Sequence, residues 1–442
     1  MTNFSELPLS AQLKSNLAKN NFTEPTPIQS LAIEPALAGK DIVATAQTGT
    51  GKTLAFLLPT IQLLSTEPRT PGIRALILTP TRELALQINE ALLQIARGTG
   101  VRAAVAVGGL NERSQLRDIR AGAGILVATP GRLYDFMSRG LVNLTTVRML
   151  ILDESDRMLD MGFLPTIKRI IAAMPAERQT LLFSATLESS VKQLVETHVR
   201  NAVRIELGSI SKPNDQVDLH LFEVEQDRKF GLLELMLNEE NGSFLVFSRT
   251  KHGADKLAKK LSQQGFKTAA IHGDRSQNQR IQALKGFQDG YYRILVATDV
   301  AARGIHVEGI SHVVNYDLPQ VPEDFIHRVG RTGRAGAKGT ASTFATRSER
   351  SEVGRIERTL SIKLKRREVS ASIVAAPRRE SAPVIVLARS NRPAQGRIDQ
   401  GRGLQGHSAQ GHSDQGRIDQ GRNKSFRSFS PKSGRRPVRR AV

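Results

Sequence analysis

Short apolar runs alternate with amphipathic stretches over the first 365 residues. Helical spacing of apolar residues separates the runs, for example over 54–64, 83–95 and 254–264. The runs themselves fall into two series, 42–44, 75–79, 101–107, 125–128, 149–152 and 180–183, then 219–224, 244–247, 268–271, 294–297, 312–315 and 341–344. Apolar strands that alternate with helices are typical of parallel sheets covered on both faces. The pattern predicts an α/β fold with two domains, over 1–207 and 217–365.

Two segments interrupt this pattern. Residues 208–216 (GSISKPNDQ) are polar and contain Gly and Pro, which predicts a linker between the domains. Residues 366–442 hold two aromatics, and six pentads of the form Gln-Gly-(Arg/His)-x-x fill 395–424. A segment of this composition buries too little apolar surface to offset its ordering entropy. We predict that 366–442 is a disordered basic tail.

The charge of the chain is strongly positive and uneven. Lys and Arg number 63 against 42 Asp and Glu, a net charge of +21, of which 365–442 contribute +13. An excess of this size indicates a polyanionic partner, most often nucleic acid, with a solvated basic surface as the alternative. The absence of cysteine excludes a disulfide scaffold, a cysteine-ligated zinc site and a cysteine nucleophile. Without a long apolar run or a signal sequence, the chain is predicted to be soluble and cytoplasmic.

A phosphate-binding loop is predicted between the strand at 42–44 and the helix at 54–64. Glycines at 49 and 51 let successive backbone N–H groups point inward at phosphate oxygens. Lys52 is then placed to reach the β- and γ-phosphates, and the hydroxyl of Thr53 to coordinate Mg²⁺. An ordinary strand-to-helix turn is the alternative. The predicted nucleotide-binding residues here are Ala46, Gln47, Thr48, Gly49, Thr50, Gly51, Lys52 and Thr53.

Acidic and basic clusters supply the remaining candidate chemistry. Asp153 and Glu154 follow the strand at 149–152, where open α/β sheets bind ligands. We expect Asp153 to hold Mg²⁺ through water and Glu154 to orient or deprotonate the attacking water, unless the acids only begin a helix. Residues 327–334 (HRVGRTGR) bring three arginines together in the second domain. Such arginines stabilise charge on a transferred phosphate, or form a basic loop that faces RNA.

The motifs together resemble those of the DEAD-box ATP-dependent RNA helicases of superfamily 2, most nearly the bacterial RhlE-like group, over about residues 4–365. In chain order they are Phe22 with 25–29 (PTPIQ), 46–53 (AQTGTGKT), 80–85 (PTRELA), 108–109 (GG), 129–132 (TPGR), 153–156 (DESD), 184–186 (SAT), 246–250 (VFSRT), 298–304 (TDVAARG) and 327–334. The resemblance implies two RecA-like domains and an adenine-reading motif over about 4–29.

Individual roles follow from the resemblance. Gln29 would pair with the adenine edge, Phe22 would stack on the ring, and Arg331 and Arg334 would act as arginine fingers. Coupling between the ATP site and the last motif would involve Ser184, Thr186 and His327. RNA would be bound through sugars and phosphates, without base readout. The implied RNA-binding residues are Arg82, Gly109, Thr129, Arg132, Arg249 and Thr298.

Two positions depart from the family pattern. Ser155 stands where the name motif has alanine, and a serine fits there with a local hydrogen bond. His306 stands where the family has an aspartate that helps bind ribose. A neutral histidine cannot replace a carboxylate, so the change is expected to weaken closure on ATP.

The sequence thus predicts an RNA-dependent ATPase that locally unwinds or remodels RNA duplexes and RNA–protein complexes, with ATP and Mg²⁺. RNA is the expected partner of the core and tail, with ribosomal precursors or an RNA-decay complex as candidates, and no membrane. One alternative is an RNA-binding or annealing protein with a weakened ATPase, and His306 and the tail support this alternative. A DNA helicase or a transport ATPase on the same core is a further alternative.

Overall fold

The computed structural model describes residues 3–46, 49–68, 70–207, 216–302, 307, 309–333, 338–369 and 373. Gln47, Thr48, His306 and Arg334 lie outside the described residues. So do the predicted linker apart from Gln216, and nearly all of the predicted tail.

The first sheet has seven strands in the order β3-β4-β2-β5-β6-β1-β7, and every neighbouring pair is parallel. Its central strands are buried at every position, as apolar runs predict. The strands are β1 Ile42–Ala46, β2 Ala75–Leu78, β3 Ala103–Ala106, β4 Ile125–Ala128, β5 Met149–Leu152, β6 Gln179–Ser184 and β7 Val203–Leu207.

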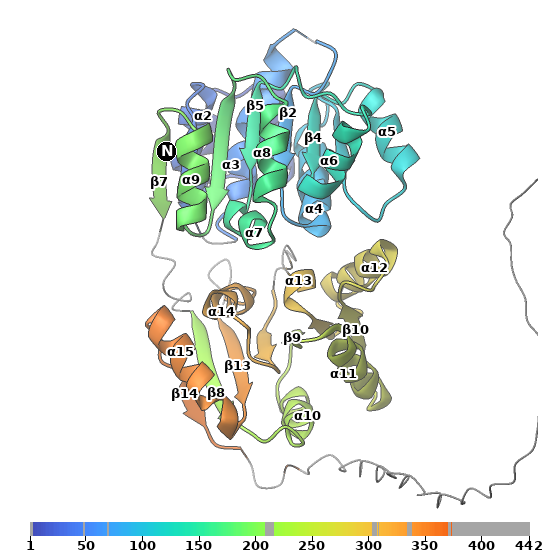
Figure 1. The fold of residues 1–442 in the computed structure, drawn as a ribbon, viewed down its shortest axis with the longest axis vertical. Coiled ribbons are helices and arrows are strands. Elements are labelled where there is room, and N and C mark those ends of the chain that lie inside the picture. The colour runs from blue at the N-terminus through green and yellow to red at the C-terminus, as the bar shows by residue number, and fades with distance from the viewer. Residues whose placement is uncertain are drawn as a thin grey trace, which may run out of the picture. The chain divides into compact units, whose positions relative to one another are not determined.

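Helices cover both faces of this sheet (Figure 1). Helices α1 to α4 share a core with Ala44 and Ile77, whereas α6, α8 and α9 share one with Val43 and Leu76. Adjacent residues of one strand thus point to opposite faces. The helices are η1 Phe4–Glu6, α1 Ala11–Lys19, α2 Pro27–Leu37, α3 Lys52–Thr66, α4 Arg82–Ile95, α5 Glu112–Arg120, α6 Pro130–Ser138, α7 Ser155–Asp160, α8 Leu164–Ala172 and α9 Ser189–His198.

The second sheet repeats this plan with the order β10-β11-β9-β12-β13-β8-β14, again parallel throughout. Helices α10 and α11 pack on one face, and α12 to α15 on the other. The strands are β8 Val217–Glu223, β9 Phe244–Phe247, β10 Thr268–Ile271, β11 Ile294–Ala297, β12 His312–Asn315, β13 Gly339–Ala345 and β14 Lys365–Arg367. The helices are α10 Lys229–Glu239, α11 Lys251–Gln263, α12 Gln277–Gln288, α13 Asp299–Ala302, α14 Pro322–Val329, η2 Arg347–Glu349 and α15 Arg350–Leu360.

The structure confirms the predicted α/β fold with two parallel sheets and adds two edge strands. Strand β7 pairs with β1, and β14 pairs with β8. Arg366 and Arg367, which the sequence placed in the tail, belong to β14 and correct the predicted start of the tail. Within the described residues, no helix is long and apolar enough to cross a membrane.

Candidate nucleotide and RNA site

The predicted phosphate loop connects the carboxyl end of β1 to the amino end of α3. Gly49 and Gly51 both adopt left-handed backbone angles, with φ of 89° and 93°. A Cβ atom on Gly51 would lie 2.5 Å from Nε2 of Gln29 and 2.8 Å from Oγ1 of Thr26. Position 51 therefore requires glycine for its backbone angle and for the close approach of α2.

Gln29 holds this loop from the first turn of α2. Its side chain is buried, its Oε1 accepts from the Thr26 N–H at 2.8 Å, and its Nε2 donates to the Gly51 carbonyl at 2.9 Å. Each end of the amide retains one further hydrogen-bonding position. Phe22, 39% exposed, presents an aromatic face to solvent at the start of the same segment. Pairing of Gln29 with adenine stays a prediction.

Lys52 and Thr53 begin α3. The Lys52 side chain is buried, and its Nζ donates to the Ala46 carbonyl across the loop at 2.7 Å. The half-buried Thr53 is the next residue of the helix. The lysine cation thus lies inside the loop that the sequence assigned to phosphates.

Asp153 lies at the carboxyl end of β5, two strands from β1 in the sheet order. Burial raises the pKa of its carboxyl to about 7, Lys52 opposes the shift, and the like charges of Glu154 and Asp156 add to it. Its Oδ1 accepts from the Glu154 N–H at 3.0 Å. A buried carboxylate with so little positive compensation fits a site for a divalent cation.

Glu154 adopts a left-handed conformation, with φ 49° and ψ 51°, at the N-cap of α7. Few residues other than glycine take these angles, and such strain concentrates at functional sites. The side chain is buried, with Oε2 3.4 Å from a guanidinium nitrogen of Arg157. The backbone turn thus directs this acid next to Asp153.

The residues at the end of β6 contact the last acid of the DESD motif. The Asp156 N–H donates to Ser184 Oγ at 3.3 Å, and Asp156 Oδ2 accepts from the N–H groups of Ala185 and Thr186 at 3.0 and 3.1 Å. Ser155 is fully buried and donates to the Phe183 carbonyl at 3.2 Å. Strands β5, β6 and β1 are neighbours, so their carboxyl ends bring the acids, Ser184 and the loop together. A link from Ser184 or Thr186 to His327 stays a prediction.

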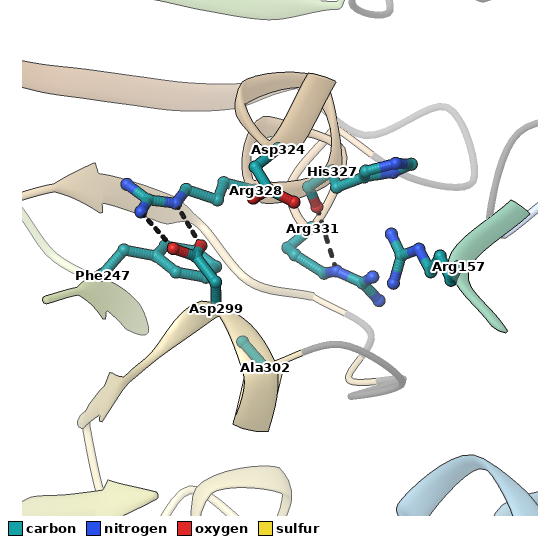
Figure 2. Close-up of a pocket in the computed structure, with 8 residues that line it drawn as sticks. All are labelled: Arg157, Phe247, Asp299, Ala302, Asp324, His327, Arg328 and Arg331. Atoms are coloured by element: carbon teal, nitrogen blue, oxygen red, sulfur yellow. Dashed lines mark hydrogen bonds and ion pairs between the residues drawn. The ribbon is translucent and has the colours of Figure 1, made fainter. Parts of the chain in front are cut away.

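Arginines of α14 and of the turn after it line a narrow pocket with Arg157 (Figure 2). Arg328 forms a bidentate pair with Asp299 at 2.6 and 2.7 Å. Arg331 is buried, its Nε donates to the His327 carbonyl at 3.2 Å, and its guanidinium points toward Arg157 in Figure 2. Arg328 is therefore a structural residue, whereas Arg331 faces the pocket. The sequence singled out neither Arg157 nor Asp299.

The RNA-binding candidates of the first domain follow β2, β3 and β4. The guanidinium of Arg82 approaches Gly109 so closely that a Cβ there would lie 2.5 Å from it, and Gly109 has φ 78°. Thr129 occupies the N-cap position of α6, and Arg132 lies 3.5 Å from Glu112 and over the ring of Phe136. These residues share the carboxyl edge of the sheet with the phosphate loop.

Glu83 makes a contact that the sequence did not indicate. The carboxylate is buried and accepts from Gln277 Nε2 and from Arg280, both at 2.8 Å. The cap of α4 is supplied by Thr81, whose hydroxyl accepts from the Leu84 N–H. Gln277 and Arg280 lie three residues apart on α12, a spacing that places both on one helix face.

Arg249 follows β9 and is held by two carboxylates. Asp317 Oδ2 accepts from the Arg249 N–H at 2.9 Å, and Glu349 Oε1 lies 3.4 Å from its guanidinium. Both carboxylates are also close to Lys229, which is fully buried. Its Nζ lies 3.6 Å from Glu349 and 4.0 Å from Asp317, and it donates to the Tyr316 carbonyl at 3.1 Å.

The pKa of the Glu349 carboxyl is lowered. Burial opposes its ionisation, whereas the Thr346 N–H and Lys229 favour it.

Thr298 is buried and begins the α13 turn.

Comparisons with known proteins agree with this architecture. Residues 26–194 match the DEAD/DEAH box helicase model, and residues 228–336 match the helicase conserved C-terminal domain. The DEAD-box ATP-dependent RNA helicase CshA of Streptococcus pneumoniae TIGR4 is 42% identical over 328 residues, 74% of this chain and 62% of that protein. The protein of that name from Geobacillus kaustophilus is 41% identical over 369 residues, 83% of this chain and 78% of the relative.

Solved structures show the same arrangement of strands and helices. S. cerevisiae Dbp5 bound to RNA and ADP BeF3 is similar with a TM-score of 0.76 and 32% identity, over 83% of this chain and 96% of that one. Mss116p bound to ssRNA and AMP-PNP has a TM-score of 0.76 and 28% identity, over 82% of this chain and 78% of that one.

The fold is that of tandem RecA-like domains. Within that class, the chain belongs to the DEAD-box helicase family, as its motifs indicated. The alignment with the pneumococcal relative covers less than two thirds of that protein. The narrower RhlE-like grouping stays a prediction.

Proposed function

We propose that this chain is an RNA-stimulated ATPase that locally unwinds or remodels RNA duplexes and RNA–protein complexes. The observation that carries the proposal is the joint placement of the Gly51 loop, buried Lys52 and the strained Glu154 at one edge of the first sheet. The named activities of the relatives, and the RNA and nucleotide analogues in the solved structures, support the same reaction.

In the proposed reaction, the loop amides and Lys52 bind the phosphates of ATP. Glu154 accepts a proton from the attacking water, because its carboxylate lies near enough to Asp153 to raise the pKa of that acid. Arg331, which points into the Figure 2 pocket, stabilises charge on the transferred phosphoryl group. Arg334 is proposed for the same role from its motif.

Asp153, through water, and Thr53 are the residues that would hold Mg²⁺. The cation would neutralise phosphate charge when bound. In its absence burial leaves the Asp153 carboxyl with a pKa near 7, so a cation stabilises its ionised form. The chain's own part is to bind and orient the triphosphate and to take up the proton.

RNA binding is proposed along the carboxyl edges of both sheets, through Arg82, Gly109 and Arg132 in the first and Arg249 in the second. These groups are guanidinium cations and backbone amides, which suit phosphates and sugars better than base edges. Ribosomal precursors or RNA-decay assemblies in the cytoplasm are the proposed setting for this activity.

The test is steady-state ATP turnover with and without single-stranded RNA. Glu154→Gln should bind ATP and lose hydrolysis, because glutamine keeps the shape and removes the base. Lys52→Ala should lose at least tenfold in turnover while nucleotide-free RNA binding persists. Turnover of Lys52→Ala within about threefold of the parent, roughly 0.7 kcal/mol in barrier, would contradict the assignment of the loop. RNA binding without any RNA-stimulated turnover in the parent would favour the annealing alternative.

A further inference from the structure

A cationic pocket lies at the opposite end of the first sheet from the phosphate loop. Asp41 precedes β1, Arg178 precedes β6 and Arg200 precedes β7, and these three strands are adjacent. Lys168 on α8 and His198 at the end of α9 complete the ring of charged groups. Five residues of β1 separate this end from the loop, roughly 17 Å at about 3.3 Å per residue. Helices α8 and α9 lie on one face of the sheet in Figure 1.

The pocket has room for a small anion or part of a larger one. Its volume is about 290 Å³, well above the volume that a single water needs. Buried side chains of Ile171 and Met174 form one wall. An apolar wall lowers the local dielectric and strengthens the pull of the facing cations on an anion.

The positive charges in this pocket are only partly offset by the protein, because Asp41 is the one acid among the lining residues. In the described chain, no carboxylate oxygen lies within 4.0 Å of a side-chain nitrogen of Lys168, Arg178 or Arg200. The one acid, Asp41, already accepts from the N–H groups of Thr180 at 2.8 Å and Arg200 at 2.7 Å.

Two buried nitrogen atoms of the lining residues have no hydrogen-bond partner among the described residues. They are Nε of Arg178 and Nε2 of His198. Burial lowers the pKa of Arg178, the neighbouring Arg200 lowers it further, and Asp41 opposes the shift. Burial likewise lowers the pKa of His198, with added repulsion from Arg178 and Lys168. A buried N–H without a partner is costly, so an acceptor that reaches Nε of Arg178 is stabilised by it.

Helix capping explains only part of the arrangement. Cations near helix C-termini interact favourably with the helix dipole, and Arg178 does donate to the Pro175 carbonyl at 2.7 Å. No hydrogen bond of the Lys168 or Arg200 side chain is found within the described part of the chain, so capping leaves these two cations unexplained.

We propose that this pocket binds phosphate groups, at a second anion site separate from the phosphate loop. Arg178 and Arg200 are the main ligands, with Lys168 and His198 completing the ring. The phosphates come either from the backbone of an RNA that extends past the core or from a free phosphorylated compound. The inference does not depend on ATP turnover, because the site is built from a different end of the sheet.

Binding of inorganic pyrophosphate and of a single-stranded 12-nucleotide RNA, each measured separately, tests the site. Both are measured on the full-length chain in a Lys52→Ala background, which weakens phosphate binding at the loop. Arg200→Gln is the primary variant, because the Arg200 side chain is exposed and makes no hydrogen bond to any residue that the structure describes. Arg178→Gln is the second variant, accompanied by a thermal unfolding control.

Arg148→Gln is the matched control. Arg148 also precedes a strand at this end of the sheet, but its guanidinium is paired with Glu67 at 3.0 Å. We expect Arg200→Gln and Arg178→Gln to weaken pyrophosphate binding roughly tenfold each, the scale of a charge-assisted hydrogen bond, and Arg148→Gln to leave it unchanged.

The two probes distinguish the source of the phosphates. If RNA affinity also falls threefold or more in the Arg200 and Arg178 variants, the site takes RNA backbone. If only pyrophosphate binding falls, the site takes a free phosphorylated compound. Equal affinities of all variants for both probes would overturn the proposal, whatever the ATPase result. Equal losses in Arg148→Gln would also overturn it, because they would reflect general surface charge.

Discussion

At the residue scale, the surroundings of the buried Lys229 connect it to Arg249. Lys229 has no exposed surface, and its Nζ lies among the Tyr316 carbonyl, Glu349 and Asp317. Those two carboxylates hold the backbone and the guanidinium of Arg249. The lysine is therefore a positioning residue for an arginine that we propose contacts RNA.

Lys229→Met should destabilise the second domain and weaken RNA binding. Methionine keeps the side-chain length but removes the buried cation between the two carboxylates and leaves only the exposed Arg249 beside Glu349, a change that costs about 3 kcal/mol or more for buried pairs. We expect a lower midpoint in urea unfolding and a raised RNA concentration for half-maximal ATPase, with turnover at saturating RNA retained.

Lys251→Met is the control, because Lys251 forms an exposed pair with Asp274. Exposed pairs contribute about 0–1 kcal/mol, so this variant should remain close to the parent. Stability of Lys229→Met within that range, with unchanged RNA dependence, would show that Lys229 has no positioning role.

At the element scale, the buried strands were predictable and the edge strands were not. The runs that became β2, β4, β9 and β11 are apolar at every position, and the chain around them marks their ends. Strand β7 alternates and β14 is Lys-Arg-Arg with every side chain exposed, so neither has an apolar run. Their pairing rests on backbone hydrogen bonds to a neighbour, which side-chain patterns do not report.

The strand–loop–helix unit of β1 and α3 depends on Gly51 in two ways that mutation can separate. Gly51→Ala combines a left-handed backbone with a collision against Gln29. Gly39 has the same kind of left-handed backbone, with φ 76°, but a Cβ added there would have no other atom within 4 Å. The left-handed conformation alone costs roughly 1–2 kcal/mol.

We expect Gly51→Ala to raise the KM for ATP at least tenfold, whereas Gly39→Ala should lower stability without changing KM. Steady-state kinetics and urea unfolding of both variants provide the comparison. A Gly51→Ala enzyme with the parental KM would mean that contact between Gln29 and the loop is dispensable.

At the scale of the whole molecule, sequence motifs identified functional residues that lie together in one short stretch, but not residue pairs that are far apart in the sequence. The phosphate loop and the DESD acids were recognisable because each lies in one short stretch beside a strand. Glu83 and Arg280 are 197 residues apart, and no spacing rule connects them. For the same reason the sequence did not select Arg157, which meets the arginines of the last motif only in three dimensions.

The contact of Glu83 with Arg280 should couple the two halves of the core energetically. Glu83→Gln and Arg280→Met should each raise the RNA concentration for half-maximal ATPase, and the double variant should be less impaired than the sum of the two. A double-mutant cycle on that quantity measures the coupling, expected at about 1–3 kcal/mol for a charged pair in contact. Strict additivity would assign the two residues to independent roles.

The C-terminal segment adds charge without motif chemistry, and its effect should depend on salt. Residues 380–442 hold 13 Lys and Arg against 4 Asp and Glu, a net charge of +9. Their removal leaves every helix and strand described above intact. Contacts of such a segment with phosphates release counterions, so affinity falls linearly with log salt in proportion to the charges engaged.

Truncation after Arg379 should therefore weaken RNA binding at low salt by about tenfold or more and flatten the dependence of log affinity on log salt. ATP turnover at saturating RNA should persist, because the residues proposed for catalysis all precede the cut. The control is a full-length chain with the 13 basic residues replaced by glutamine, which separates charge from length. Fluorescence anisotropy at several salt concentrations measures both slopes. If truncated, neutralised and parental proteins share one slope, the segment does not bind RNA and the core alone carries the affinity.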